Sequence, residues 1–278
     1  MNARRLLRNP LSAGGLAVVV LFLLLGIFAP IFTHYDPNLC DLGAQLVPPS
    51  GDHLLGTDSL GRDLFARILY GARMSIPIGF AVVFLALAVG MLVGCTAGYA
   101  GGVVDEALMR LTDLFLAFPA LILAMAVAGA LGPSLFNSLI ALGVAWWPPY
   151  ARLVRAQVMG LRNAHYVEAA RTMGASHVYI LFRHIMPNCL GPVVVQGTLD
   201  LGGVILTAAG LSFIGLGVQP PDAEWGSMVS MGRLYIASHW WVSTFPGLAI
   251  LMVVMGFNLF GDGLRDVLDP RQKSRRTL

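Results

Sequence analysis

Charged residues are scarce in this sequence, and their scarcity argues against a soluble protein. Asp, Glu, Lys and Arg make up 12% of the 278 residues, whereas soluble domains carry about 25%. The apolar residues, 56% of the chain, stand in long runs. Because roughly 20 apolar residues in a helix cross the hydrocarbon core of a bilayer, these runs indicate an integral membrane protein.

Cysteine is also rare, and its placement excludes a disulfide framework. Cys40 falls in an outer loop, Cys95 within a predicted span and Cys189 near the inner face. The spacing matches no zinc motif, so we expect small apolar side chains at these positions and no metal site.

The usual groupings of catalytic residues are missing too. Glutamate occurs only at positions 106, 168 and 224, and the histidines never form the H-x-x-x-H or H-E-x-x-H pairs of zinc enzymes. The stretch GLSFIG at 210–215 lacks the G-x-S-x-G spacing of a serine nucleophile. Its glycines are better explained by close helix packing. The sequence therefore predicts no enzyme.

An ATP-binding loop is absent from the sequence as well. The P-loop pattern G-x-x-x-x-G-K-[ST] needs a lysine that reaches the phosphates. The only lysine, Lys273, lies in the polar tail without that glycine pattern. If ATP drives this protein, a separate polypeptide must bind it. The arginines flank the apolar runs, so they do not indicate a nucleic-acid partner.

We predict an all-α fold with six transmembrane helices. Two tryptophans and two prolines at 146–149 interrupt the fourth, and tryptophan at a span end is typical of the membrane interface. The predicted spans are 11–32, 75–100, 111–131, 135–151, 190–217 and 243–262.

The basic residues predict that both termini are cytoplasmic. With the N-terminus inside, 14 of the 18 Lys and Arg residues fall on the cytoplasmic side, as the positive-inside rule requires. They are Arg4, Arg5, Arg8, Arg110, Arg152, Arg155, Arg162, Arg171, Arg183, Arg265, Arg271, Lys273, Arg275 and Arg276. The first apolar run is too long for a cleaved signal peptide, so we expect an uncleaved anchor.

Two outer segments show amphipathic patterns. In LGTDSLGRDLFARILYGARMS, residues 55–75, apolar residues recur at helical spacing between charged ones. This predicts a helix on the outer membrane surface that turns at Gly71 into the second span. The loop 218–242 is amphipathic too. We divide the chain into an anchor helix with its outer loop and interfacial amphipathic helix, 1–74, and a five-helix core, 75–278.

Residues 166–188, YVEAARTMGASHVYILFRHIMPN, form a polar interruption between the fourth and fifth spans. On a helical wheel the apolar face is Tyr166, Ala169, Ala170 and Met173, and the polar face is His165, Glu168, Arg171 and Thr172. Gly174 suits a left-handed C-terminal cap, and Ser176 suits the N-cap of a second helix. We expect Pro187 to redirect the chain into the fifth span.

The first helix of this segment allows two interpretations. Its small apolar face suits docking into a groove of a partner protein, since alanines permit a close approach. Glu168 and Arg171, three residues apart, can pair with each other or with that partner. Equally, the helix can rest on its own bundle or on lipid headgroups.

Ionisable residues in the spans suggest an alternative source of energy. Asp200, in TLDLGG, lies within the fifth span, and Asp113 lies just inside the third. Intramembrane carboxylates mark ion pathways, although they also hold helices together by hydrogen bonds. A self-contained ion-coupled carrier that uses Asp200 as part of its translocation pathway is therefore an alternative.

Several motifs resemble those of one transporter family. EAARTMG followed by HIMP at 184–187 is similar to the EAA loop of bacterial ABC importer membrane subunits, whose pattern is E-A-A, three residues, Gly, nine residues, then I-x-L-P. The residues that match in register are Glu168, Ala169, Ala170, Gly174 and Pro187, while His184 and Met186 replace Ile and Leu. LGTDSLGRDLFARILYGARMS, DLFLAFPALIL, LSFIGLGVQPP and NLFGDGLRDVLDPR resemble the dipeptide, oligopeptide and nickel permeases. The resemblance covers nearly the whole chain.

The resemblance implies a type I ABC importer permease fold with a peripheral first span. It also implies a cytoplasmic coupling loop at about 152–189, whose helix docks into a groove of an ATPase. The residues expected to couple are Tyr166, Glu168, Ala169, Ala170, Arg171, Met173, Gly174 and Pro187. The implied partners are a homologous second permease, an extracytoplasmic solute-binding protein, and one or two ATP-binding subunits. Those subunits would bind ATP and Mg²⁺, and this chain would bind no cofactor.

On these grounds we expect one permease subunit of an ATP-driven importer in the bacterial cytoplasmic (inner) membrane. Its expected solute is a di- or oligopeptide or a related small molecule, and a nickel chelate, an opine or glutathione is an alternative. His34, His53 and His239 are scattered through the outer loops, so we expect them to be solvent-exposed and they do not favour nickel.

Overall fold

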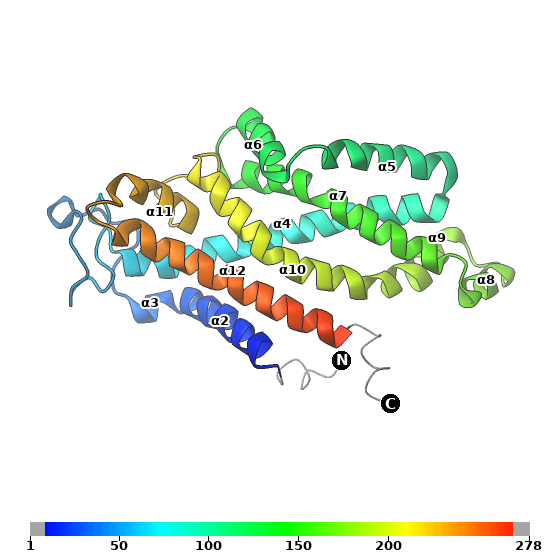
Figure 1. The fold of residues 1–278 in the computed structure, drawn as a ribbon, viewed down its shortest axis with the longest axis horizontal. Helices are drawn as coiled ribbons and strands as arrows, with labels where there is room; N and C mark the ends of the chain where they lie inside the picture. The colour runs from blue at the N-terminus through cyan, green and yellow to red at the C-terminus, as the bar shows by residue number, and fades with distance from the viewer. Residues whose placement is uncertain (1–8, 269–278) are drawn as a thin grey trace.

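The computed structural model describes residues 9–268 of the chain. Throughout this range the chain is helical and forms no strand, and its long helices run along the length of the molecule (Figure 1). The elements are α2 (Pro10–Ile27), α3 (Ala29–Phe32), η1 (Leu42–Ala44), α4 (Leu64–Ala100), α5 (Gly102–Leu116), α6 (Ala120–Leu131), α7 (Leu135–Leu161), α8 (His165–Thr172), α9 (His177–Ile180), the π-helical turn η2 (Leu181–Ile185), α10 (Met186–Phe213), α11 (Trp225–Gly232), η3 (Arg233–Tyr235) and α12 (Trp241–Leu268). The basic residues nearest the two termini lie outside the described residues.

The all-α class is confirmed, but the count of six spans is not. Within 9–268, four helical segments are long and apolar enough to cross a membrane, and the bent pair α5 and α6 is a fifth candidate. The four are Pro10–Ile27, Leu64–Ala100, His177–Phe213 and Trp241–Val267. The fourth predicted span corresponds to α7, which has 27 residues. Tryptophan, proline and polar residues dilute its apolar run.

The third predicted span, 111–131, is not one continuous helix. α5 and α6 meet at an angle of 88°, and Pro119 stands directly before α6. Proline has no amide hydrogen to donate, and its ring disfavours a helical conformation at the preceding residue. The chain therefore bends sharply at the C-terminal end of the sequence DLFLAFP, residues 113–119.

The predicted turn at Gly71 is wrong, because α4 runs without a break from Leu64 to Ala100. Asp63 begins the helix by accepting a hydrogen bond from the amide of Ala66 at 2.7 Å. Gly71 makes room for another element instead: a Cβ there would lie 2.7 Å from the indole of Trp225. The proposed division of the chain after residue 74 consequently falls inside α4, and it remains a prediction.

α7 also continues further than expected, through Pro148 and Pro149 to Leu161. It packs along α4, and a Cβ at Gly94 would lie 2.5 Å from the carbonyl oxygen of Ala151. A Cβ at Gly98 would similarly lie 2.9 Å from Val158. Glycines four residues apart thus bring the two backbones together. The contacts along this buried seam stabilise α7 as one continuous helix, although its two prolines alone would favour a break.

The first span packs closely against the last. α2 lies along α12 (Figure 1), and a Cβ at Gly15 would lie 2.6 Å from the carbonyl oxygen of Gly256. At the other end of α2, the Arg73 guanidinium donates to the carbonyls of Gly26 (2.6 Å) and Ile27 (2.8 Å). Arg73 thereby satisfies terminal carbonyls that a helix leaves unpaired.

Candidate coupling segment and outer cap

The segment 162–185 projects from one end of the molecule, opposite the loop 33–63 and α11 (Figure 1). Its first helix, α8, ends at Thr172, and Gly174 follows with a φ of +80°. The amide of Gly174 donates to Arg171 O at 2.9 Å, and that of Ala175 donates to Ala170 O at 3.0 Å. This pair of hydrogen bonds is a Schellman motif, which confirms the predicted left-handed cap.

The second half of the segment differs from the expectation at Pro187. Ser176 caps α9 as predicted, accepting from the amide of Tyr179 at 3.3 Å. From His177 the helix then continues to Phe213 as one uninterrupted segment. The π-helical turn η2 bonds the amide of Met186 to Leu181 O, so the extra residue of the wider turn accommodates Pro187. The prediction that Pro187 redirects the chain is therefore wrong.

Burial divides the residues of α8 differently from the helical wheel. Val167 and Ala170 are buried, and they pack with Ile180 and Ile185 of the following helix. Ala170 therefore turns inward, away from the predicted docking face. Sequence inspection missed Val167, although its spacing of three residues from Ala170 is typical of a buried helix face.

The remaining apolar residues of α8 and its cap are open to solvent. Tyr166 is 42% exposed and Met173 is 80% exposed, with Ala169 exposed between them. Glu168 is exposed as well, and Nδ1 of His165 lies 3.9 Å from its carboxylate. No ion pair joins Glu168 to Arg171 among the described residues. The exposed edge of α8 is thus formed by Tyr166, Glu168, Ala169 and Met173.

A contact that the sequence did not reveal ties this segment to α4. The hydroxyl of Tyr99, near the inner end of α4, lies 2.8 Å from Nδ1 of His177. The guanidinium carbon of Arg171 lies 5.7 Å from the centre of the Tyr99 ring, within the range of a cation–π interaction. Tyr99 therefore contacts both helices on either side of Gly174.

Ion pairs fasten α5 to the inner half of α7. Arg155 donates to Asp105 at 2.7 Å, and Arg152 donates to Asp113 at 2.6 Å. Asp113, considered above as part of an ion pathway, therefore pairs with an arginine, and both side chains are more than half exposed.

Asp200 lies near the middle of α10 and is partly exposed. Its carboxylate accepts a hydrogen bond from the Gln196 amide at 3.0 Å. The buried hydroxyl of Tyr150 lies beside this carboxylate, but it makes no well-aligned hydrogen bond with any described residue. Asp200 is far from the coupling segment, so the structure does not bring the two predicted sites together.

The end of the molecule opposite α8 holds an unexpected buried charge cluster. We call this end, formed by the loop 33–63, the start of α4 and the segment 214–240, the outer cap, after its predicted side of the membrane. Arg62 donates to Asp58 at 2.8 Å, and both side chains are almost fully buried. Arg67, fully buried, donates to the carbonyls of Pro37 (2.6 Å) and Pro221 (3.3 Å). It thereby links α4 to two outer loops that are distant in sequence.

Glu224 is a second buried acid of the outer cap. It accepts hydrogen bonds from the amides of Gly226 (2.9 Å) and Ser227 (2.8 Å) at the start of α11. Burial raises the pKa of the Glu224 carboxyl above its usual value, while these hydrogen bonds act in the opposite direction. The carboxyl therefore caps the start of α11.

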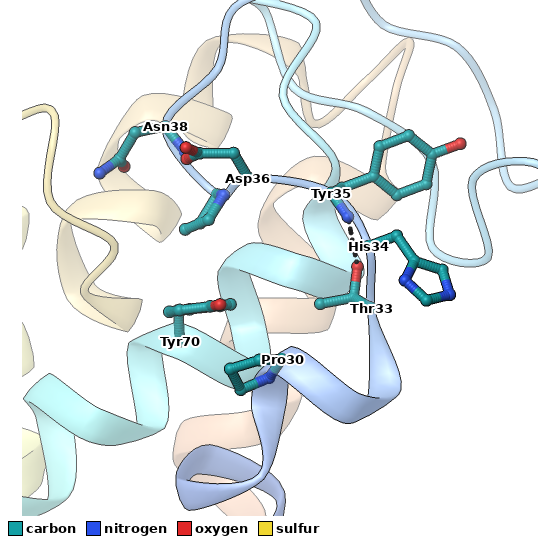
Figure 2. Close-up of a pocket in the computed structure, with 8 residues that line it drawn as sticks. Pro30, Thr33, His34, Tyr35, Asp36, Asn38 and Tyr70 are labelled. Carbon is teal, nitrogen blue, oxygen red and sulfur yellow. Dashed lines mark hydrogen bonds between the residues drawn. The ribbon is translucent and has the colours of Figure 1, made fainter.

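A shallow pocket of about 580 Å³ opens beside the first outer loop. Figure 2 shows Asp36 and Asn38 on one side of this loop and His34 and Tyr35 on the other. The amide of Tyr35 donates to the Thr33 hydroxyl at 3.2 Å. Within the described part of the chain, no three His, Cys, Asp or Glu residues are close enough to hold a metal ion.

Two protein-family models match the chain. Residues 86–274 match the model described as "Binding-protein-dependent transport system inner membrane component". Residues 2–49 match the model described as "N-terminal TM domain of oligopeptide transport permease C".

Curated relatives resemble the chain over almost its full length. The "Probable D,D-dipeptide transport system permease protein DdpC" of Escherichia coli is 49% identical over 97% of this chain and 90% of the relative. The "Dipeptide transport system permease protein DppC" of Alkalihalophilus pseudofirmus is 46% identical over 98% of this chain and 89% of the relative.

A solved structure shares the fold at low sequence identity. A chain of the MetNI methionine ABC transporter, in an inward-facing conformation, superposes with a TM-score of 0.56 at 20% identity. The match covers 72% of this chain and 94% of the other.

Proposed function

Since this chain belongs to the family of binding-protein-dependent transport system inner membrane components, we propose that it is a permease subunit of an ATP-driven importer for di- or oligopeptides. The observation that carries the choice of solute is the 46–49% identity to two permeases named for dipeptides, over nearly the whole chain. A nickel chelate, an opine or glutathione remains the alternative solute class.

The exposed edge of α8 is the proposed contact with a separate ATPase subunit. Tyr166, Ala169 and Met173 offer apolar anchors, and Glu168 offers a charge, on a helix held by the Gly174 cap. When the ATPase subunits bind ATP and Mg²⁺ and close, α8 moves with them. Because the helix from His177 to Phe213 is continuous, this motion passes along it into the membrane.

The proposed assembly also contains a homologous second permease and an extracytoplasmic solute-binding protein. The proposed orientation places both termini and α8 in the cytoplasm. In support of it, α2 begins and α12 ends toward the half of the molecule that carries α8 (Figure 1). The outer cap then faces the solute-binding protein.

Reconstitution of the complete complex tests this function. The two permeases, the ATPase subunits and the binding protein are placed in liposomes, and ATP-dependent uptake of a radiolabelled dipeptide is measured beside nickel, an opine and glutathione. We expect dipeptide uptake and dipeptide-stimulated ATP hydrolysis. Stimulation by one of the other solutes alone would overturn the choice of peptide, and ATP-independent uptake would overturn the importer mechanism.

A further inference from the structure

Along one side of α10, polar and small residues recur at helical spacing. Each is partly exposed, and they are Gln196, Asp200, Gly203, Thr207 and Gly210. We refer to these five residues as the polar stripe. A helix face directed at lipid would carry large apolar side chains, because hydrocarbon cannot hydrogen-bond with amides, carboxylates or hydroxyls.

The apolar side chains that α10 exposes most lie off this stripe. Leu190, Val194 and Leu206 are 45%, 49% and 56% exposed. Leu206 and Thr207 are neighbours in sequence but point to different sides of the helix, since successive residues are rotated by about 100°. The apolar residues on either flank of the polar stripe thus suit lipid or an apolar partner, and the polar stripe itself suits water.

Asp200 supplies the charge of the polar stripe. None of the ion pairs among the described residues includes it, and its only well-aligned hydrogen bond comes from Gln196. Aromatic residues of α7 flank it: the hydroxyl of Tyr150 lies beside the carboxylate, and the indole of Trp146 packs on Gly203, 3.2 Å from a Cβ placed there. A carboxylate without an ion pair, with an aromatic ring one helical turn away, suits an ammonium group.

We propose that the polar stripe lines the translocation pathway and that Asp200 receives the ammonium group of the solute as it passes. The ligand class rests on the proposed function, since a free peptide carries an α-ammonium group. The Gln196 amide holds the carboxylate toward the pathway, and the Tyr150 hydroxyl lies beside it. The partly exposed Trp146 ring favours a cation over an anion there.

Cysteine accessibility tests where the pathway runs, independently of the solute. In a background with Cys40→Ser, Cys95→Ala and Cys189→Ala, Thr207→Cys and Leu206→Cys are compared in the assembled complex during ATP turnover. The probe is the membrane-impermeant cation (2-(trimethylammonium)ethyl) methanethiosulfonate. We expect Thr207→Cys to react at least tenfold faster than Leu206→Cys. Equal rates would overturn the assignment of the polar stripe to the pathway.

Charge selectivity tests the role of Asp200. The rate of Thr207→Cys modification by the cationic reagent is divided by its rate with the anionic sulfonatoethyl analogue. We expect Asp200→Asn to lower this ratio severalfold, and the matched variant Gln196→Glu to raise it. An unchanged ratio in Asp200→Asn would overturn the ammonium site. Neither result depends on peptide uptake, so failure of the proposed solute is recognised separately by the uptake assay.

Discussion

At the scale of single residues, two positions decide how the coupling segment is held. Gly174 has the left-handed φ of +80° that ends α8, and Tyr99 contacts both neighbouring helices through His177 and Arg171. Gly174 supplies a backbone conformation that residues with a Cβ adopt only at a cost in free energy. Tyr99 supplies a hydrogen bond to His177 and an aromatic ring to Arg171.

Gly174→Ala is expected to lower ATP-driven uptake severalfold while the chain still inserts into the membrane. A Cβ at this φ costs roughly 1–2 kcal/mol, so the Schellman cap loosens and α8 loses its fixed orientation. Gly160→Ala is the matched control, because Gly160 lies in a helix with open space around it and no positive φ. Equal uptake by both variants would contradict a role for the cap.

Tyr99→Phe is expected to reduce the stimulation of ATP hydrolysis by loaded binding protein and to leave unstimulated hydrolysis unchanged. The substitution removes a hydrogen bond, with a net value of about 0.5–1.5 kcal/mol, and keeps the ring under Arg171. Tyr179→Phe is the control, since Tyr179 is exposed and its ring lies 5.6 Å from that of His184. If both variants retain full stimulation, the contact between α4 and the coupling segment does not contribute.

At the scale of elements, glycine spacing sets how closely the helices approach. Gly90, Gly94 and Gly98 recur every fourth residue on α4, and each would clash with α7 if it carried a Cβ. The same principle joins α2 to α12 at Gly15 and Gly256. Such seams replace the hydrophobic effect, which does not drive helix association within lipid.

Gly94→Val is expected to destabilise the protein by about 1–3 kcal/mol through overpacking of the α4–α7 seam. Thermal unfolding of the purified complex in detergent measures the effect as a lower midpoint temperature. Gly129→Val in α6 provides the comparison, because a Cβ at Gly129 meets nothing within 4 Å. A midpoint as low in Gly129→Val as in Gly94→Val would show that valine is unfavourable irrespective of the seam.

At the scale of the whole molecule, the two ends are built differently. One end is a cap tied together by the buried groups Asp58, Arg62, Arg67 and Glu224. The opposite end presents α8 with an exposed edge (Figure 1). A cap held by buried polar contacts at one end and an exposed helix at the other suit a protein that contacts different partners on the two sides of a membrane.

Thiol labelling of intact cells is expected to distinguish the two ends. Native Cys40 is exposed in the outer cap, whereas Cys95 and Cys189 are buried, so an impermeant maleimide should label wild-type cells only at Cys40. In a Cys40→Ser background, Met173→Cys should be labelled in inverted vesicles alone, and less so when the ATPase subunits are bound. Labelling of Met173→Cys from outside would reverse the proposed orientation.

The sequence by itself determined the helical class, the membrane location and the local caps at Gly174 and Ser176, because these depend on apolar run length and on the conformations open to single residues. The motif around Glu168 and Gly174 likewise indicated the family. Pro119 by itself indicates a bend between α5 and α6. The span 111–131 was predicted from hydropathy averaged over many residues, and such an average does not register a single proline.

Only the tertiary structure decided which breaks occur and which surfaces remain open. Gly71 was predicted to form a turn, but in the structure it makes room for the indole of Trp225. The prolines of α7 lie within a continuous helix that packs closely on α4, and Pro187 follows a π-helical turn. Ala170 faces inward because Val167 beside it packs on Ile180. Local sequence sets only the conformational free energy of each segment. Contacts between residues distant in the chain determine whether an unfavourable local conformation is stabilised.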